Sequence, residues 1–176
     1  YETPDVFNMW IVNGEIDLQA RSVDVGNFTL FKESEADGDY KVLVGVEPSH
    51  VAVSLNMTSQ NETLRTFFST KDVRFALNYA VNREEMNELV YDGLMTPRQY
   101  SPVEKSAQYY PDQAFANIEY DPDKANELLD GAGYDQRDAE GYRVDPDTGE
   151  TVFFTIEGIE AAGSPYEDAM QLIVKY

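Results

Sequence analysis

The chain has 176 residues, and 13 Lys and Arg against 33 Asp and Glu give it a formal net charge of −20. Hydrophobic residues make up 42% of the sequence, which is enough for a packed core and excludes a largely disordered chain. Binding of nucleic acid or anionic lipid depends on Lys and Arg, so the excess of acids excludes both classes of partner. The sequence has no cysteine, which excludes disulfides, Cys-ligated zinc and thiol nucleophiles.

The first predicted element is a helix over residues 3–14. Thr3 is a suitable N-cap, and Pro4 suits the first helical position. Apolar side chains follow at spacings of three and four, and Gly14 is a typical C-terminal stop. The alternating residues 15–19 then predict a short strand.

Three further strands are predicted from β-branched and alternating residues. The first two cover residues 40–46 and 51–57, and the polar residues 58–63 after them are expected to form a loop. The third strand, 151–157, follows an acidic turn region with Gly and Pro.

From Thr70 the apolar spacing becomes helical, and two consecutive helices are predicted. Asn82 caps the second of them in a variant of the capping box, and Gly93 ends it. Residues 95–120 contain prolines and tyrosines without a sustained period, which indicates a long ordered loop.

Two more helices complete the chain. Asp121 as N-cap and Pro122 as first residue predict one that ends at Gly133. The last helix is predicted from the apolar spacing that begins at Tyr166. Because strands and helices alternate, the expected fold class is α/β, with a mixed sheet flanked by helices.

The many carboxylates do not form a recognisable active site. No His or Lys accompanies any pair of nearby acids in a way that would orient it, so no catalytic residue and no cofactor site is assigned. Asp145 and Asp147 begin a stretch that resembles the start of a calcium loop, but the further ligands of that pattern are missing. The sequence of the stretch favours a tight hairpin turn instead. An acidic glycoside hydrolase domain and a calcium-dependent module over residues 138–150 remain as alternatives.

A specific resemblance is carried by residues 69–93, whose sequence runs from Ser-Thr-Lys-Asp-Val-Arg to Val-Tyr-Asp-Gly. This segment resembles a signature of the family 5 extracellular solute-binding proteins, the dipeptide-, oligopeptide- and nickel-binding receptors of ABC importers. The turn Asn-Gly-Glu-Ile-Asp at 13–17, the strand end 55–58 and the capped helix at 120–134 are similar to further segments of that family, in the same order.

The resemblance implies part of a type II periplasmic-binding-protein fold, in which two α/β lobes close on a solute without catalysis. Residues 1–46 would be the end of the first lobe and the approach to the hinge. Residues 47–176 would be the first half of the second lobe, truncated, with 47–58 as a crossing strand. Family members are much longer, so this chain is expected to be a fragment of one.

The implied partners are an ABC permease in the membrane and a small solute, either an oligopeptide or, as an alternative, an oligosaccharide. No cofactor is implied. The full-length protein is expected outside the cell or in the periplasm, with a lipid anchor. Ligands of open α/β sheets bind where strands end, and tyrosine rings suit the lining of a cleft. The candidate ligand-binding residues are therefore Asn56, Met57, Thr58, Tyr100 and Ser101.

Overall fold

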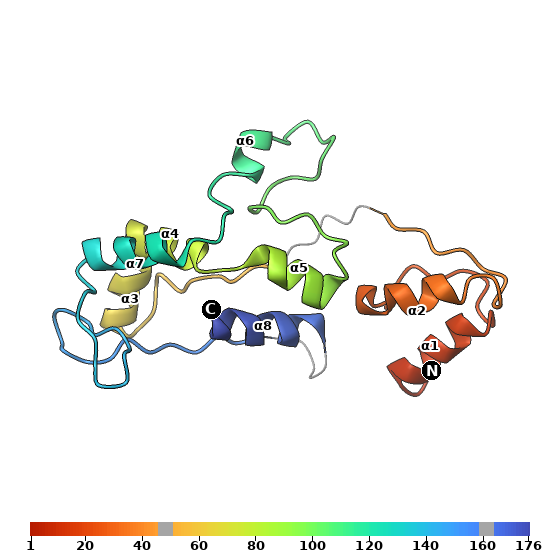
Figure 1. Cartoon of the computed structure of the whole chain (residues 1–176), viewed down its shortest axis with the longest axis horizontal. Helices are drawn as coiled ribbons and strands as arrows, with labels where there is room; N and C mark the ends of the chain where they lie inside the picture. Colours follow the sequence, from red (N-terminus) through yellow and green to blue (C-terminus); the bar gives the residue numbers. More distant parts are fainter. Residues whose placement is uncertain (46–50, 159–163) are drawn as a thin grey trace.

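The computed structural model describes residues 1–45, 51–158 and 164–176, and the regular elements in these ranges are helices (Figure 1). In chain order they are α1 (Pro4–Val12), the 3-10 turn η1 (Val25–Asn27), α2 (Phe28–Glu33), α3 (Glu62–Ser69), α4 (Lys71–Tyr79), α5 (Arg83–Tyr91), α6 (Pro111–Ala114), α7 (Pro122–Gly131) and α8 (Pro165–Lys175). Helices α3, α4 and α7 pack together at one end, α5 lies beside α8, and α1 and α2 form a pair at the other end (Figure 1).

Helix α1 begins as the sequence predicts. Thr3 Oγ1 accepts a hydrogen bond from the Val6 amide at 3.3 Å, and Pro4 is the first helical residue. After the helix, Gly14 has a φ of +70° and lies against the backbone of Gly38, where a Cβ would overlap the carbonyl oxygen. Only glycine fits this approach, so Gly14 fixes the loop around residue 38 to the end of α1.

The α1–α2 pair meets the rest of the chain at the end of α5. Thr29 Oγ1 donates to Asp92 Oδ2 at 3.0 Å, and Asp92 is the left-handed C-cap of α5. The predicted lobe boundary at residue 46 lies outside the described residues, which resume at residue 51, and the division of the chain there stays a prediction.

The helices predicted from capping residues are confirmed. Asn82 Oδ1 accepts from the Glu85 amide at 3.1 Å at the start of α5. Asp121 Oδ1 accepts from the Lys124 amide at 2.9 Å, directly before the first residue of α7. A carboxylate or amide oxygen in this position satisfies one of the free N–H groups of the first helical turn.

Three short helices were not predicted, namely α2, α3 and α6. The beginning of α3 lies in a polar stretch that was expected to be a loop, because Asn61, its N-cap, looks like a loop residue in the sequence. Its side chain accepts from the Leu64 amide at 3.1 Å and starts the helix. None of the described helices has both the length and the apolar character needed to cross a membrane.

The expected α/β class with a mixed sheet is wrong for the residues that the structure describes. Residues 15–19, 40–45, 51–57 and 151–157, which were expected to be strands, do not pair into a sheet. Bridge pairing in the described part of the chain is limited to two isolated antiparallel bridges, Arg137 with Arg143 and Val144 with Thr151. A strand needs a second segment for its backbone hydrogen bonds, and an alternating sequence does not supply one.

The core lies between α3, α4 and the loop after α7. Its buried members are Phe67, Phe68, Val73 and Tyr134, and the Phe67 ring stands edge-on to the Tyr134 ring at 4.9 Å between centroids. Leu55 and Phe154, from two of the expected strands, pack against this cluster without pairing with each other. A second cluster of Ala76, Tyr79 and Ala125 joins α4 to α7, where two alanines let the helices approach closely.

Candidate functional site

Asn56, Met57 and Thr58 form a tight turn immediately before α3. Asn56 Oδ1 accepts from both the amide and the hydroxyl of Thr58, at 3.1 Å each, in the pattern of an Asx turn. The Met57 side chain is 49% exposed, whereas the preceding Leu55 packs against the core. The turn therefore presents Met57 to the surface and is held in place by Leu55.

Tyr100 and Ser101 lie in the long loop between α5 and α6 and face in opposite directions. Tyr100 is 74% exposed, whereas Ser101 is buried. The loop is fixed beside them by Gln99, whose amide donates to the Ala114 carbonyl at 2.8 Å and whose side chain donates to Asn78 Oδ1 at 3.0 Å. Tyr100 is thus an exposed ring on a firmly held backbone.

The predicted site residues are anchored in two places. The turn at Asn56 rests on the α3 core through Leu55, and the loop at Tyr100 rests on α4 and α6 through Gln99. That the two groups bind one solute stays a prediction.

Asp145 acts as a turn residue. It is buried, and its Oδ1 accepts from the Asp147 amide at 3.1 Å, the Thr148 amide at 2.9 Å and the Thr148 hydroxyl at 3.0 Å. Asp138 is used similarly: hydrogen bonds from the Thr151 hydroxyl and from backbone amides hold the pKa of its carboxyl below the usual range. Within the described ranges, His, Asp and Glu side chains do not gather in threes around a possible metal position.

The role of Asp145 gives a prediction for the turn. Asp145→Ala removes the acceptor for three hydrogen bonds, so we expect a loss of about 1–2 kcal/mol in unfolding free energy. The matched variant Asp147→Ala removes a side chain that is exposed, and we expect it to change stability by less than about 0.5 kcal/mol. Urea unfolding of both variants measures the difference, and equal losses would show that the Asp145 carboxylate does not hold the turn.

Sequence reasoning missed a polar junction between α4, α5 and the long loop. Arg83 Nη2 donates to Asn78 Oδ1 at 2.5 Å and its Nη1 donates to the Asn78 carbonyl at 3.0 Å. Gln99 donates to the same Asn78 oxygen, and Tyr79 donates its hydroxyl to Asn117 Oδ1 at 2.7 Å. Burial lowers the pKa of the Arg83 guanidinium below its ordinary value.

One signal in the sequence could have indicated this junction. Arg83 is the first residue of α5, where the positive end of the helix dipole disfavours a cation. An arginine in this position indicates a partner outside its own helix. Asn78 and Gln99 carry no comparable signal, because such side chains are common in helix ends and loops.

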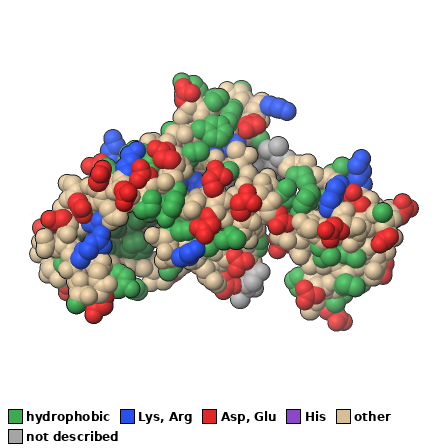
Figure 2. Space-filling view, in the orientation of Figure 1, with side chains coloured by type: hydrophobic (Ala, Val, Ile, Leu, Met, Phe, Trp, Pro, Cys, Tyr) green, Lys and Arg blue, Asp and Glu red, His purple; other side chains and the backbone are tan. Residues whose placement is uncertain are grey.

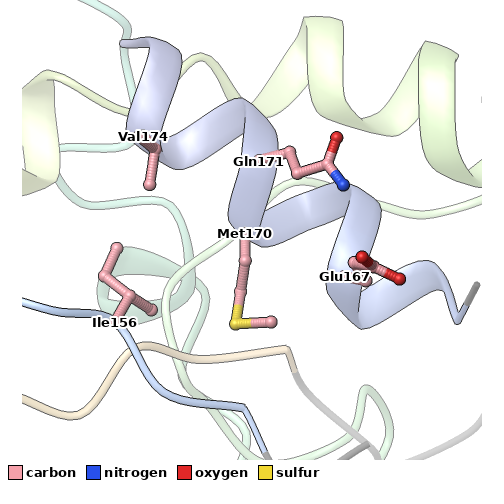
Figure 3. A pocket seen from close by; sticks show the side chains of 5 residues that line it. All are labelled: Ile156, Glu167, Met170, Gln171 and Val174. Carbon is pink, nitrogen blue, oxygen red and sulfur yellow. The ribbon is translucent and has the colours of Figure 1, made fainter. Parts of the chain in front are cut away.

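A shallow groove of about 290 Å³ runs along α8 (Figure 3). Met170 and Val174 project from the helix on the side of Ile156, and Glu167 and Gln171 complete the lining. The lining is mostly apolar and holds no pair of carboxylates, so the groove offers packing surface rather than acid–base chemistry.

Comparison with known proteins identifies the family. The sequence profile of the middle region of the bacterial extracellular solute-binding proteins, family 5, matches residues 6–176. The chain belongs to this family. Two family 5 relatives are glutathione-binding proteins GsiB: one from Pectobacterium atrosepticum is 33% identical over 99 residues, covering 53% of this chain and 17% of the relative. The other, from Escherichia coli K12, is 42% identical over 76 residues, which cover 43% of this chain and 14% of the relative.

A solved structure extends the family 5 likeness to the fold. An oligopeptide-binding protein OppA superposes with a TM-score of 0.60 at 38% sequence identity, over 85% of this chain and 25% of that protein. The stretches that match this chain thus make up a quarter or less of the length of these three family 5 proteins.

Proposed function

We propose that this chain is part of the solute-binding component of an ABC importer, and that the protein binds short peptides or peptide-like solutes. The observation that carries the proposal is the family 5 match over residues 6–176. The likeness to an oligopeptide-binding protein at 38% identity supports it independently. The protein acts outside the cytoplasmic membrane, held there by a lipid anchor, and passes its solute to a permease.

The mechanism is closure of two lobes around the solute. A solute that contacts both lobes binds the closed state more tightly than the open one, and it shifts the population toward closure by that difference in affinity. The closed form then docks on the permease. This mechanism requires no covalent bond to form or break.

Among solutes, peptides are favoured over oligosaccharides. The relatives are named for glutathione and for oligopeptides, and both ligands carry peptide bonds. We infer that Asn56, Met57, Thr58, Tyr100 and Ser101 line the part of the cleft that this chain supplies. The exposed Tyr100 ring and the exposed Met57 side chain provide adaptable apolar contact for peptide side chains.

Calorimetry on the protein at its natural length tests this assignment. With a short peptide that the protein binds, we expect Tyr100→Ala to raise Kd about tenfold, because the contact of one aromatic ring is worth roughly 1–1.5 kcal/mol. Asn56→Ala removes the acceptor that shapes the turn at Met57, and we expect a similar loss.

The matched control is Tyr142→Ala. Tyr142 is also exposed, at 64%, but lies in the loop after α7. Unchanged affinity in Tyr142→Ala together with weaker binding in the other two variants supports the assignment. Wild-type affinity in both Tyr100→Ala and Asn56→Ala would remove these residues from the binding cleft.

A further inference from the structure

The surface of this chain carries far more negative than positive charge. Figure 2 shows acidic side chains spread over the visible face from the α1–α2 pair to α7, with Lys and Arg more sparsely placed. The sequence has 33 acids, and the ion pairs of the described residues include those of Glu35, Glu62, Glu85, Glu104, Glu119 and Asp130.

Several of the 13 basic residues bind neutral oxygens instead of carboxylates. Arg74 Nη1 donates to the carbonyls of Phe68 and Ser69, at 2.9 and 2.6 Å. Arg83 binds Asn78, and Arg137 binds a backbone carbonyl at 2.9 Å. These cations stabilise loops and helix ends. Because their partners are neutral, they pair with no acid there, and the surrounding negative charge remains in excess.

The packing brings acidic segments together. Residues 135–150 contain six acids and two arginines. Arg143 ties this loop to α7 by contacts with Asp130 and Asn126. Helix α7 is itself acidic, so the fold holds two negative segments side by side. Burial raises the pKa of the Tyr134 phenol beneath them, and the charges of Asp145 and Asp147 raise it further.

Repulsion between like charges disfavours a compact state, and dissolved salt screens it. The Debye length is about 10 Å at 0.1 M salt but about 3 Å at 1 M, so molar salt suppresses repulsion between all but adjacent charges. We propose that this chain is adapted to a medium of molar ionic strength, in which its acidic surface is screened, and that its fold loses stability when the salt is diluted. This proposal is independent of which solute the protein binds.

The test compares two variants that change the same five positions. The neutralised variant carries Glu127→Gln, Asp135→Asn, Glu140→Gln, Asp147→Asn and Glu150→Gln. All five side chains are exposed and serve as acceptors in none of the side-chain hydrogen bonds of the described residues. The control exchanges the two acids at these positions and keeps every charge: Glu127→Asp, Asp135→Glu, Glu140→Asp, Asp147→Glu and Glu150→Asp.

The measurement is the midpoint of thermal unfolding of the protein at its natural length, with hydrogen exchange of the α7 amides as a local readout. From about 0.1 M to about 2 M NaCl, we expect the Tm of wild type and of the charge-keeping control to rise by about 10 °C. The neutralised variant should start from a higher Tm at low salt and rise by less. Its α7 amides should exchange more slowly at low salt than those of the control.

A parallel series in sucrose separates screening from other stabilising effects, because sucrose stabilises by exclusion from the surface and does not screen charge. Sucrose should raise the Tm of both variants equally. A wild-type Tm that does not rise with NaCl would overturn the proposal. It would also be overturned if the neutralised and charge-keeping variants had the same dependence on NaCl, or if they differed as much in sucrose as in NaCl.

Discussion

Replacing Phe67 by alanine should lower the stability of the α3–α4 region by about 3–5 kcal/mol, the range found when a buried aromatic side chain is deleted. Phe67 is 4% exposed, and its ring contacts those of Phe68, Tyr134 and Phe154 at centroid distances of 5.5, 4.9 and 6.2 Å. Alanine would leave a cavity between α3 and the loop that carries Tyr134. This cluster joins α3 to the loop that carries Tyr134, far away in the sequence, so we expect both segments to be destabilised.

Hydrogen exchange of the natural-length protein measures this loss locally. We expect protection of the α3 and α4 amides to fall by about two to four orders of magnitude, since about 1.4 kcal/mol corresponds to a tenfold change. Phe153→Ala is the matched control, because its ring is 77% exposed and its removal should change protection little. If the two variants behaved alike, Phe67 would not be at the centre of the core.

The second large effect is expected at Arg83. Arg83→Met keeps much of the apolar stem but removes the guanidinium that donates to Asn78 Oδ1 and to the Asn78 carbonyl. Hydrogen bonds of charged groups contribute about 1.5–3 kcal/mol, and the partly buried Asn78 loses a donor, so we expect a loss of about 2–3 kcal/mol. Lysine should not restore it, because a single ammonium cannot reproduce the planar fork of donors.

Urea unfolding of Arg83→Met and Arg83→Lys measures this contribution, with Arg21→Met as the control. Arg21 is exposed, and the described contacts give its side chain no acceptor. We expect the control to stay within about 0.5 kcal/mol of wild type. Full stability in Arg83→Lys would mean that only the positive charge matters, which contradicts a junction built on directed hydrogen bonds.

The helices with side-chain caps could be predicted from the sequence because their starting signals are local. Asn82 and Asp121 each place an oxygen next to a free amide three residues on, and this geometry depends on a few neighbouring residues. The same rule would have found α3 at Asn61, but the polar residues around that cap look like a loop. Local signals thus predicted most of the described helices, but they missed α3, whose N-cap lies in a polar stretch.

The prediction of strands was wrong because strand formation does not depend on local sequence alone. Alternation at residues 51–57 predicts one shared face for Val51, Val53, Leu55 and Met57, but only Leu55 packs against the core and the other three are 45–49% exposed. Phe154 of the 151–157 segment packs against the same core. A sheet also requires the backbones of such segments to pair, and the described chain has two isolated bridges instead. The resemblance to the family implied a sheet, and the structure of these residues corrects that expectation.

The surroundings of the candidate residues could be predicted only in part, and their role in binding stays a prediction. Asn56 was expected at the end of a strand and lies in an Asx turn instead, whereas the mixture of prolines and tyrosines indicated the loop that presents Tyr100. The junction of Arg83, Asn78 and Gln99 depends on residues up to 21 positions apart, and it is visible only once the chain is folded. Such contacts leave no periodic pattern in the sequence.

The central claim is that this family 5 chain belongs to a protein that binds a small solute and releases it chemically unchanged. The most direct test is calorimetric titration of the natural-length protein with short peptides, followed by mass spectrometry of the peptide recovered after release. We predict saturable binding and recovery of the peptide at its original mass. Cleavage or modification of the peptide, or a protein that binds no peptide at all, would contradict the account.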